Sequence, residues 1–97
     1  MPAYISLVNW TEQGVKNAKD TLNRAKAAEE ALIKMGGRKI GIWWTLGQYD
    51  IVYIFEAPDD ETATKFLVSL GMKGFTRTNT MRCFSEEEAA SIMQGLP

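Results

Sequence analysis

The chain has 97 residues, 45% of them hydrophobic, with 11 basic against 12 acidic side chains and no histidine. Its length fits one domain over residues 1–97, with a real core but much surface left to solvent or to self-association. The near-neutral charge lacks the basic excess of a nucleic-acid-binding protein. The missing histidines exclude the usual catalytic triads and most zinc sites, so any catalysis would have to use carboxylates, Tyr, Lys, Arg or a bound cofactor. We assign no metal and no cofactor, and the catalytic residues stay unknown.

The first two predicted elements are a strand and a long helix. Residues Ala3–Asn9 alternate imperfectly and predict a strand at the centre of a sheet. Thr11 is the expected N-cap of a helix that ends at Gly36-Gly37. The apolar residues at helical spacing that we expect on its buried side are Val15, Ala18, Leu22, Ala25, Leu32 and Ile33.

Two apolar runs around Gly47, residues 40–46 and 51–56, predict a β-hairpin in the middle of the chain. The first run places Ile40, Ile42, Trp44 and Leu46 on one face and Gly41, Trp43 and Thr45 on the other. The two adjacent tryptophans therefore point in opposite directions, and which of them faces away from the helices is left open. The second run is also apolar on both faces, which predicts a partner that covers the second face.

The C-terminal half predicts two helices around one strand. Pro58-Asp59-Asp60-Glu61 opens a helix with an Asp N-cap, which Gly71 and Gly74 close, and its expected buried residues are Ala63, Phe66, Leu67 and Leu70. The segment 75–84 alternates and carries many polar residues, as an edge strand does. Ser85-Glu86-Glu87-Glu88 is a capping box, and it begins a terminal helix expected to pack down through Ala89, Ile92 and Met93.

The predicted order is βαββαβ followed by a terminal helix. Right-handed crossovers around a central hairpin favour an α+β class, ferredoxin-like sandwich, with an antiparallel four-stranded sheet and two helices on one face. The other face stays open and apolar. Two such faces packed together would make a dimeric α+β barrel, so we expect a homodimer or a higher homo-oligomer.

The hairpin turn also carries a resemblance to a known family. Gly47-Gln48-Tyr49-Asp50, then Glu56-Ala57-Pro58-Asp59-Asp60, then Thr78 and Thr80 in the last strand resemble the GYD-domain family of small proteins. The likeness covers nearly the whole chain. It implies a single GYD-like domain related to dimeric α+β barrels, and because the family has no established activity, it implies no catalytic residue.

A set of aromatic and polar residues forms the candidate ligand site. On an open sheet face, aromatic walls with a few polar groups would suit a small, flat or apolar ligand. The same aromatics would also serve as the packed core of a dimer. Arg77 and Arg82 are candidates to neutralise Glu56 or an anionic ligand. The candidate residues are Tyr4, Trp43, Trp44, Tyr49, Asp50, Tyr53, Glu56, Arg77, Thr78, Thr80 and Arg82.

Three turn residues have structural explanations beside the functional ones. Gly47 is expected to adopt a positive φ in the turn. Tyr49 and Asp50 either form an acid–base pair at the mouth of a cleft or serve the fold, and we favour the second, with Asp50 accepting hydrogen bonds from turn amides.

Two functions follow from these expectations. The first is a homo-oligomeric small-molecule-binding module, or a cofactor-independent enzyme, that uses a cavity on the open face of the sheet. The alternative is a structural or assembly protein whose sheet faces serve only self-association. With a single cysteine, Cys83, and with no stretch typical of a signal peptide or a membrane span, we expect a cytoplasmic protein without membrane contact.

Overall fold

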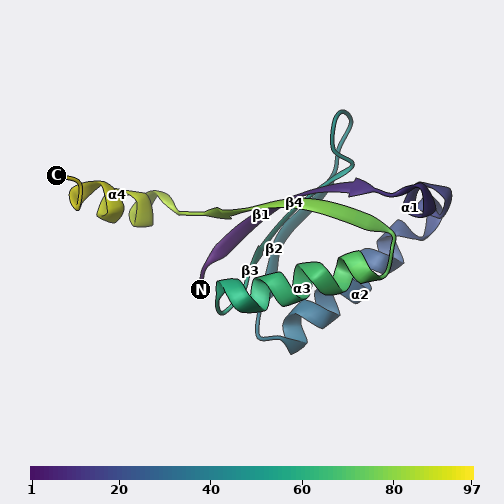
Figure 1. The fold of residues 1–97 in the computed structure, drawn as a ribbon, viewed down its shortest axis with the longest axis horizontal. Coiled ribbons are helices and arrows are strands. Elements are labelled where there is room, and N and C mark those ends of the chain that lie inside the picture. The colour runs from purple at the N-terminus through teal and green to yellow at the C-terminus, as the bar shows by residue number, and fades with distance from the viewer.

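The computed structural model describes residues 1–97 as one four-stranded sheet with two long helices on one side (Figure 1). The strands are β1 (Ala3–Trp10), β2 (Arg38–Trp44), β3 (Ile51–Glu56) and β4 (Thr76–Cys83). The helices are α1 (Glu12–Lys16), the 3-10 turn η1 (Ala18–Asp20), α2 (Thr21–Lys34), α3 (Asp60–Met72) and α4 (Glu86–Gln94). No helix combines the length and the apolar character needed to cross a membrane.

The sheet has the strand order β2-β3-β1-β4, and all its neighbouring strands are antiparallel. β1 lies between β3 and β4, as predicted for a central strand, and β2 and β4 form the two edges. Helices α2 and α3 both lie below the sheet in Figure 1. This arrangement confirms the predicted ferredoxin-like α+β fold.

The core lies between the sheet and these two helices. Phe55 and Phe66 are fully buried and meet edge to face, with ring centroids 5.3 Å apart. Tyr4 stacks on Phe55, with ring centroids 5.2 Å apart. Such aromatic pairs add about 1 kcal/mol beyond the area that they bury. The buried apolar residues are Tyr4, Val8, Leu32, Ile51, Tyr53, Phe55, Ala57, Ala63 and Phe66.

The predicted long first helix is divided in the structure, which corrects the expectation of one continuous helix. Thr11 is the N-cap, as predicted, and its hydroxyl accepts a hydrogen bond from the Gly14 amide at 3.1 Å. The chain then leaves the helix at Asn17, passes through η1 and begins α2 at Thr21. This break changes the helical phase. Three residues assigned to the buried stripe are exposed: Val15 before the break, and Leu22 and Ile33 in α2, where Ala28 and Leu32 face the core instead.

Strand β2 begins and ends two residues earlier than predicted and contains a bulge between Lys39 and Gly41. The bulge leaves Ile40 exposed, and the strand ends before Leu46, which is fully exposed in the loop, so neither residue joins Ile42 and Trp44 as expected. Beyond the bulge the alternation is regular. Trp43 pairs with Val52 on the open face, whereas Trp44 pairs with Ile51 on the helix side.

Helix α3 follows its prediction closely. Asp59 is the N-cap, and its carboxylate accepts a hydrogen bond from the Thr62 amide at 2.7 Å. Hydrogen bonding from the side chain and the backbone amide of Thr62 lowers the pKa of Asp59 below its ordinary value. The expected inner residues of α3 lie in or against the core, and Gly74 adopts a positive φ of 84° just after the helix.

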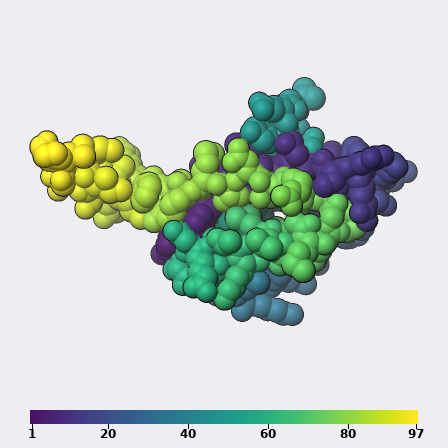
Figure 2. All heavy atoms as spheres, in the orientation of Figure 1, coloured from purple at the N-terminus to yellow at the C-terminus, as the bar shows by residue number.

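Helix α4 begins at the predicted capping box. It does not pack on the rest of the domain, so the expectation that it would do so is wrong. The Ser85 hydroxyl accepts from the Glu88 amide, while the Ser85 amide donates to the Glu88 carboxylate. Both Ile92 and Met93 are exposed, and α4 projects beyond the end of the sheet as a separate arm (Figure 2). The radius of gyration is 14.6 Å, against about 12.5 Å for a compact chain of this length, because this arm extends the molecule.

Candidate functional site

The face of the sheet that α2 and α3 leave uncovered carries an apolar patch contributed by all four strands. We call this set the open-face patch: Ile5, Leu7, Trp43, Val52, Ile54 and Met81. Trp43 is 52% exposed, and its ring lies over Gly41, where any Cβ would collide with it. Gly41 thus allows the indole to lie flat on the sheet.

Charged and polar side chains surround the open-face patch. Arg38 and Glu56 form an ion pair across β2 and β3 at one end, and Asn9 of β1 lies on the same face near the other. An apolar centre with a polar rim is the usual anatomy of a protein interface.

The candidate ligand residues do not gather on the open face, which corrects the expectation of one shared site there. Strand register places Trp43 and Glu56 on the open face, whereas Arg77, on the edge strand β4, has its guanidinium beside Gly71 of α3. Tyr49 and Asp50 lie in the loop between β2 and β3. The members placed on the helix side are Tyr4, Trp44, Tyr53, Thr78, Thr80 and Arg82. The two groups lie on opposite sides of one sheet and cannot contact the same ligand.

Two buried tyrosines on the helix side differ in their hydrogen bonding. Tyr4 donates its hydroxyl proton to Asp60 at 2.6 Å, whereas the hydroxyl of Tyr53 is buried without any partner. Burial raises the pKa of both groups to about 12, and for Tyr4 the hydrogen bond to the Asp60 carboxylate adds to the effect. Both phenols are therefore neutral hydrogen-bond donors at physiological pH.

Asp50 joins the base of the hairpin to the end of β1. Its carboxylate accepts a hydrogen bond from the Trp10 amide at 2.9 Å, and its own amide donates to the Val8 carbonyl. The favoured structural role is therefore present, but its partner is β1 and not the turn predicted from the sequence. Gly47 has a φ of 131°, which confirms the expected positive φ in the loop.

Neither Arg77 nor Arg82 pairs with Glu56, and the guanidinium of Arg77 lies beside Gly71 of α3. Arg38 is the residue that pairs with Glu56. Arg82 stacks on Phe84, with its guanidinium 4.3 Å from the ring centroid, and reaches Glu88 at 3.8 Å. The role of Arg82 is therefore local, at the start of the C-terminal arm.

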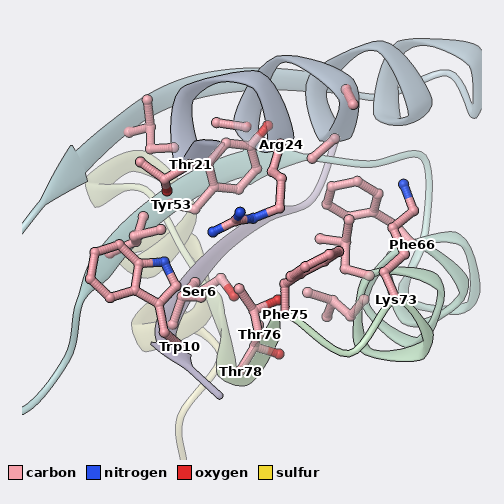
Figure 3. Close-up of a pocket in the computed structure, with 18 residues that line it drawn as sticks. Ser6, Trp10, Thr21, Arg24, Tyr53, Phe66, Lys73, Phe75, Thr76 and Thr78 are labelled. Atoms are coloured by element: carbon pink, nitrogen blue, oxygen red, sulfur yellow. The ribbon is translucent and has the colours of Figure 1, made fainter. Parts of the chain in front are cut away.

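A cavity of about 140 Å³ lies between the helix side of the sheet and helices α2 and α3 (Figure 3). We call it the helix-side cavity. Three alanines of α2, Ala25, Ala27 and Ala28, line it and leave space beside the longer side chain of Arg24 from the same helix. The larger residues that wall it are Val8, Trp10, Ile42, Ile51, Tyr53, Phe66, Leu67, Leu70 and Phe75.

The helix-side cavity contains polar groups that sequence reasoning missed. The guanidinium of Arg24 lies 4.7 Å from the Phe75 ring centroid and donates to two carbonyl oxygens, those of Asn17 and Gly14. In Figure 3 it occupies the centre of the view, with the indole nitrogen of Trp10 turned towards it. Of the predicted set, only Tyr53 and Thr78 line this cavity. The run of alanines in α2 is the one sequence signal for it.

No group of three or more His, Cys, Asp or Glu side chains is placed to hold a metal ion. The helix-side cavity has no carboxylate among its lining residues, and the carboxylate of Asp50 is engaged by a backbone amide.

The GYD domain family model matches residues 4–93. A Thermus thermophilus protein described as a "glutamine synthetase and cystathionine beta-lyase binding protein" is 29% identical over 82 residues, which cover 84% of this chain and 86% of the relative. The crystal structure of a protein from Thermus thermophilus superposes with a TM-score of 0.54 at 22% identity, covering 88% of this chain and 95% of that one. A hypothetical protein from Pyrococcus horikoshii gives a TM-score of 0.54 at 17% identity, with 89% and 93% covered.

Proposed function

The chain belongs to the GYD domain family, and from that premise we propose that it is a homo-oligomeric protein-binding module whose copies pair through their open-face patches. The observation that carries this proposal is the uncovered apolar face of the sheet. Six apolar side chains from four strands lie there without a helix above them. Exposed apolar surface of this kind on a small domain is typical of an interaction site.

A second copy is the occupant that fits this face. Paired sheets lie about 10 Å apart and bury their inner side chains between them, so two open faces would complete each other's core. Trp43 alone exposes about 130 Å² on each copy, taking about 250 Å² for a free tryptophan. Burying both would contribute about 6 kcal/mol at about 25 cal/mol per Å². Part of this contribution is offset by the translational and rotational freedom that two copies lose on association.

The relative from Thermus thermophilus supports a role in binding other proteins. Its name says that it binds glutamine synthetase and cystathionine beta-lyase, and it aligns with most of this chain. We propose that this chain also binds an enzyme as its partner, once its own sheet faces are paired. Tyr49 and Asp50, for which we favoured a structural role, lie in the loop between β2 and β3, where Asp50 bonds the end of β1.

The pairing is tested by placing a charge in the open-face patch. We expect the unmodified protein to sediment as a dimer or a higher oligomer at micromolar concentration, and Trp43→Glu to sediment as a folded monomer. A carboxylate buried between two apolar faces would lose its hydration without a partner. Leu46→Glu is the matched control, because Leu46 is fully exposed in the loop outside the patch. It should leave the sedimentation coefficient unchanged.

The partner is tested with purified enzymes. Glutamine synthetase and cystathionine beta-lyase from the same organism should bind the immobilised protein with micromolar affinity or better, and Trp43→Glu should weaken this binding. If the unmodified protein sediments as a monomer, the proposed pairing is wrong. If neither enzyme binds, the proposed class of partner is wrong.

A further inference from the structure

The helix-side cavity contains two buried hydrogen-bonding atoms without a protein partner. They are the hydroxyl of Tyr53, whose side chain is only 6% exposed, and the indole nitrogen of Trp10. Buried polar atoms in folded proteins nearly always have partners. The indole nitrogen of Trp10 faces the inside of the cavity, towards Ser6 and Arg24 (Figure 3). The cavity therefore offers hydrogen bonds that no residue of the chain takes up.

The polar groups of the cavity are biased towards donors and positive charge. The indole of Trp10 can only donate, and a neutral phenol such as Tyr53 donates readily to an oxygen atom. Arg24 and Lys73 are the charged residues of the lining, and neither is paired with a carboxylate. Of the five N–H groups of Arg24, the two hydrogen bonds to carbonyls leave three. A ligand that fits must therefore bring acceptors and negative charge.

Size and wall chemistry define the rest of the ligand. A cavity of about 140 Å³ is close to the volume of about 150 Å³ at which an apolar cavity accepts a single benzene ring. The surrounding side chains are mostly apolar or aromatic. The body of the ligand is accordingly apolar and about as large as one ring.

We propose that the helix-side cavity binds a small organic monocarboxylate with an apolar body of about one ring. Its carboxylate lies against the guanidinium of Arg24 and the indole nitrogen of Trp10, and its ring packs below the alanines of α2. This site is on the opposite side of the sheet from the open-face patch. It does not depend on the proposed pairing, so the Trp43→Glu monomer should bind the same ligand.

The test uses phenylacetate as the probe and the indole N–H of Trp10 as the reporter. In two-dimensional ¹⁵N–¹H spectra, we expect millimolar phenylacetate to move the Trp10 indole signal saturably and to leave the Trp43 indole signal in place. Phenylacetamide has the same shape without the charge, and we expect it to bind about tenfold more weakly, because hydrogen bonds to charged groups are the stronger ones.

Two variants locate the site. Ala28→Leu places a larger side chain in the cavity and should abolish the shift of the Trp10 signal while the protein remains folded by circular dichroism. Ala90→Leu makes the same change on the exposed arm α4 and should leave phenylacetate binding intact. If Ala28→Leu does not fold, Arg24→Gln serves instead and should weaken phenylacetate at least tenfold while leaving phenylacetamide binding unchanged.

Three results would overturn the proposal. The first is a Trp10 signal that does not respond to phenylacetate, with ordered water alone bonded to Trp10 and Tyr53 in a crystal structure. The second is equal affinity for phenylacetate and phenylacetamide, which would show that charge is not recognised. The third is a shift that persists in Ala28→Leu, which would place the ligand elsewhere.

Discussion

Two buried tyrosines on the same face of the sheet allow the energetic role of a hydrogen bond to be measured directly. Tyr4 and Tyr53 are 4% and 6% exposed and both contact Phe55. They differ in that the Tyr4 hydroxyl donates to Asp60 at 2.6 Å, whereas the Tyr53 hydroxyl has no partner. Removing each hydroxyl by substitution with phenylalanine should therefore change stability in opposite directions.

The magnitudes follow from the partners. Tyr4→Phe removes a hydrogen bond to a carboxylate, and such bonds contribute about 1.5–3 kcal/mol, so we expect the free energy of unfolding to fall by about 2 kcal/mol. Tyr53→Phe removes a buried hydroxyl that has no hydrogen-bond partner, and burying such a group costs about 1–3 kcal/mol. We therefore expect the free energy of unfolding to rise by about 1 kcal/mol. For a domain of this length, the second change would raise the melting temperature by about 4–8 °C.

The assay is urea denaturation followed by circular dichroism at one fixed protein concentration, because self-association makes stability depend on concentration. The slope of the unfolding free energy against urea should be the same for both variants and the parent, since neither changes the surface exposed on unfolding. A Tyr53→Phe variant that is destabilised as much as Tyr4→Phe would refute the reasoning, because it would show that the Tyr53 hydroxyl is hydrogen-bonded in the ligand-free protein.

The remaining predictions concern pH, the hairpin base and one close backbone contact. The pKa of both buried tyrosines is raised to about 12, from about 10 in the unfolded chain. The stability that comes from keeping both phenols protonated is therefore present below about pH 10 and is lost as the pH rises towards 12. A series of denaturation curves at alkaline pH would detect this loss. Asp50→Ala should lower the unfolding free energy by about 1–2 kcal/mol by removing the acceptor of the Trp10 amide, whereas Asp50→Asn should cost less because an amide oxygen remains, as urea titration would show. A Cβ at Gly14 would meet the carbonyl of Phe75, so Gly14→Ala should lower the unfolding free energy by about 2 kcal/mol or more, and a melt equal to that of the parent would contradict this packing.

The fold and the helix starts could be predicted from the sequence because their signals are local. Each of the caps Thr11, Asp59 and Ser85 bonds an amide three residues away, so its partner lies within the same short segment. The alternation of strand residues and the order of the elements then leave few arrangements of a four-stranded sheet. The order β2-β3-β1-β4 is the one that right-handed crossovers favour.

The break between α1 and α2 is not visible in the spacing of the apolar residues along the sequence. The chain leaves the helix at Asn17, whose side chain bonds the Gln13 carbonyl and whose own carbonyl is held by Arg24. Asparagine competes in this way with helical hydrogen bonding. The sequence pattern alone indicates one continuous helix, and the assigned residues nearest the break on either side, Val15 and Leu22, are both exposed.

By itself, the sequence determined the family, the fold class and the caps of the helices, since these depend on residues that are neighbours along the chain. The candidate site was decided only by tertiary structure. A single bulge at Ile40 and the register between distant strands set which of Trp43 and Trp44 faces the open side. The packing of α2 and its alanines against the sheet creates the helix-side cavity. Side-chain direction in a sheet reverses at every residue, so one inserted residue in the pairing moves a side chain to the opposite face.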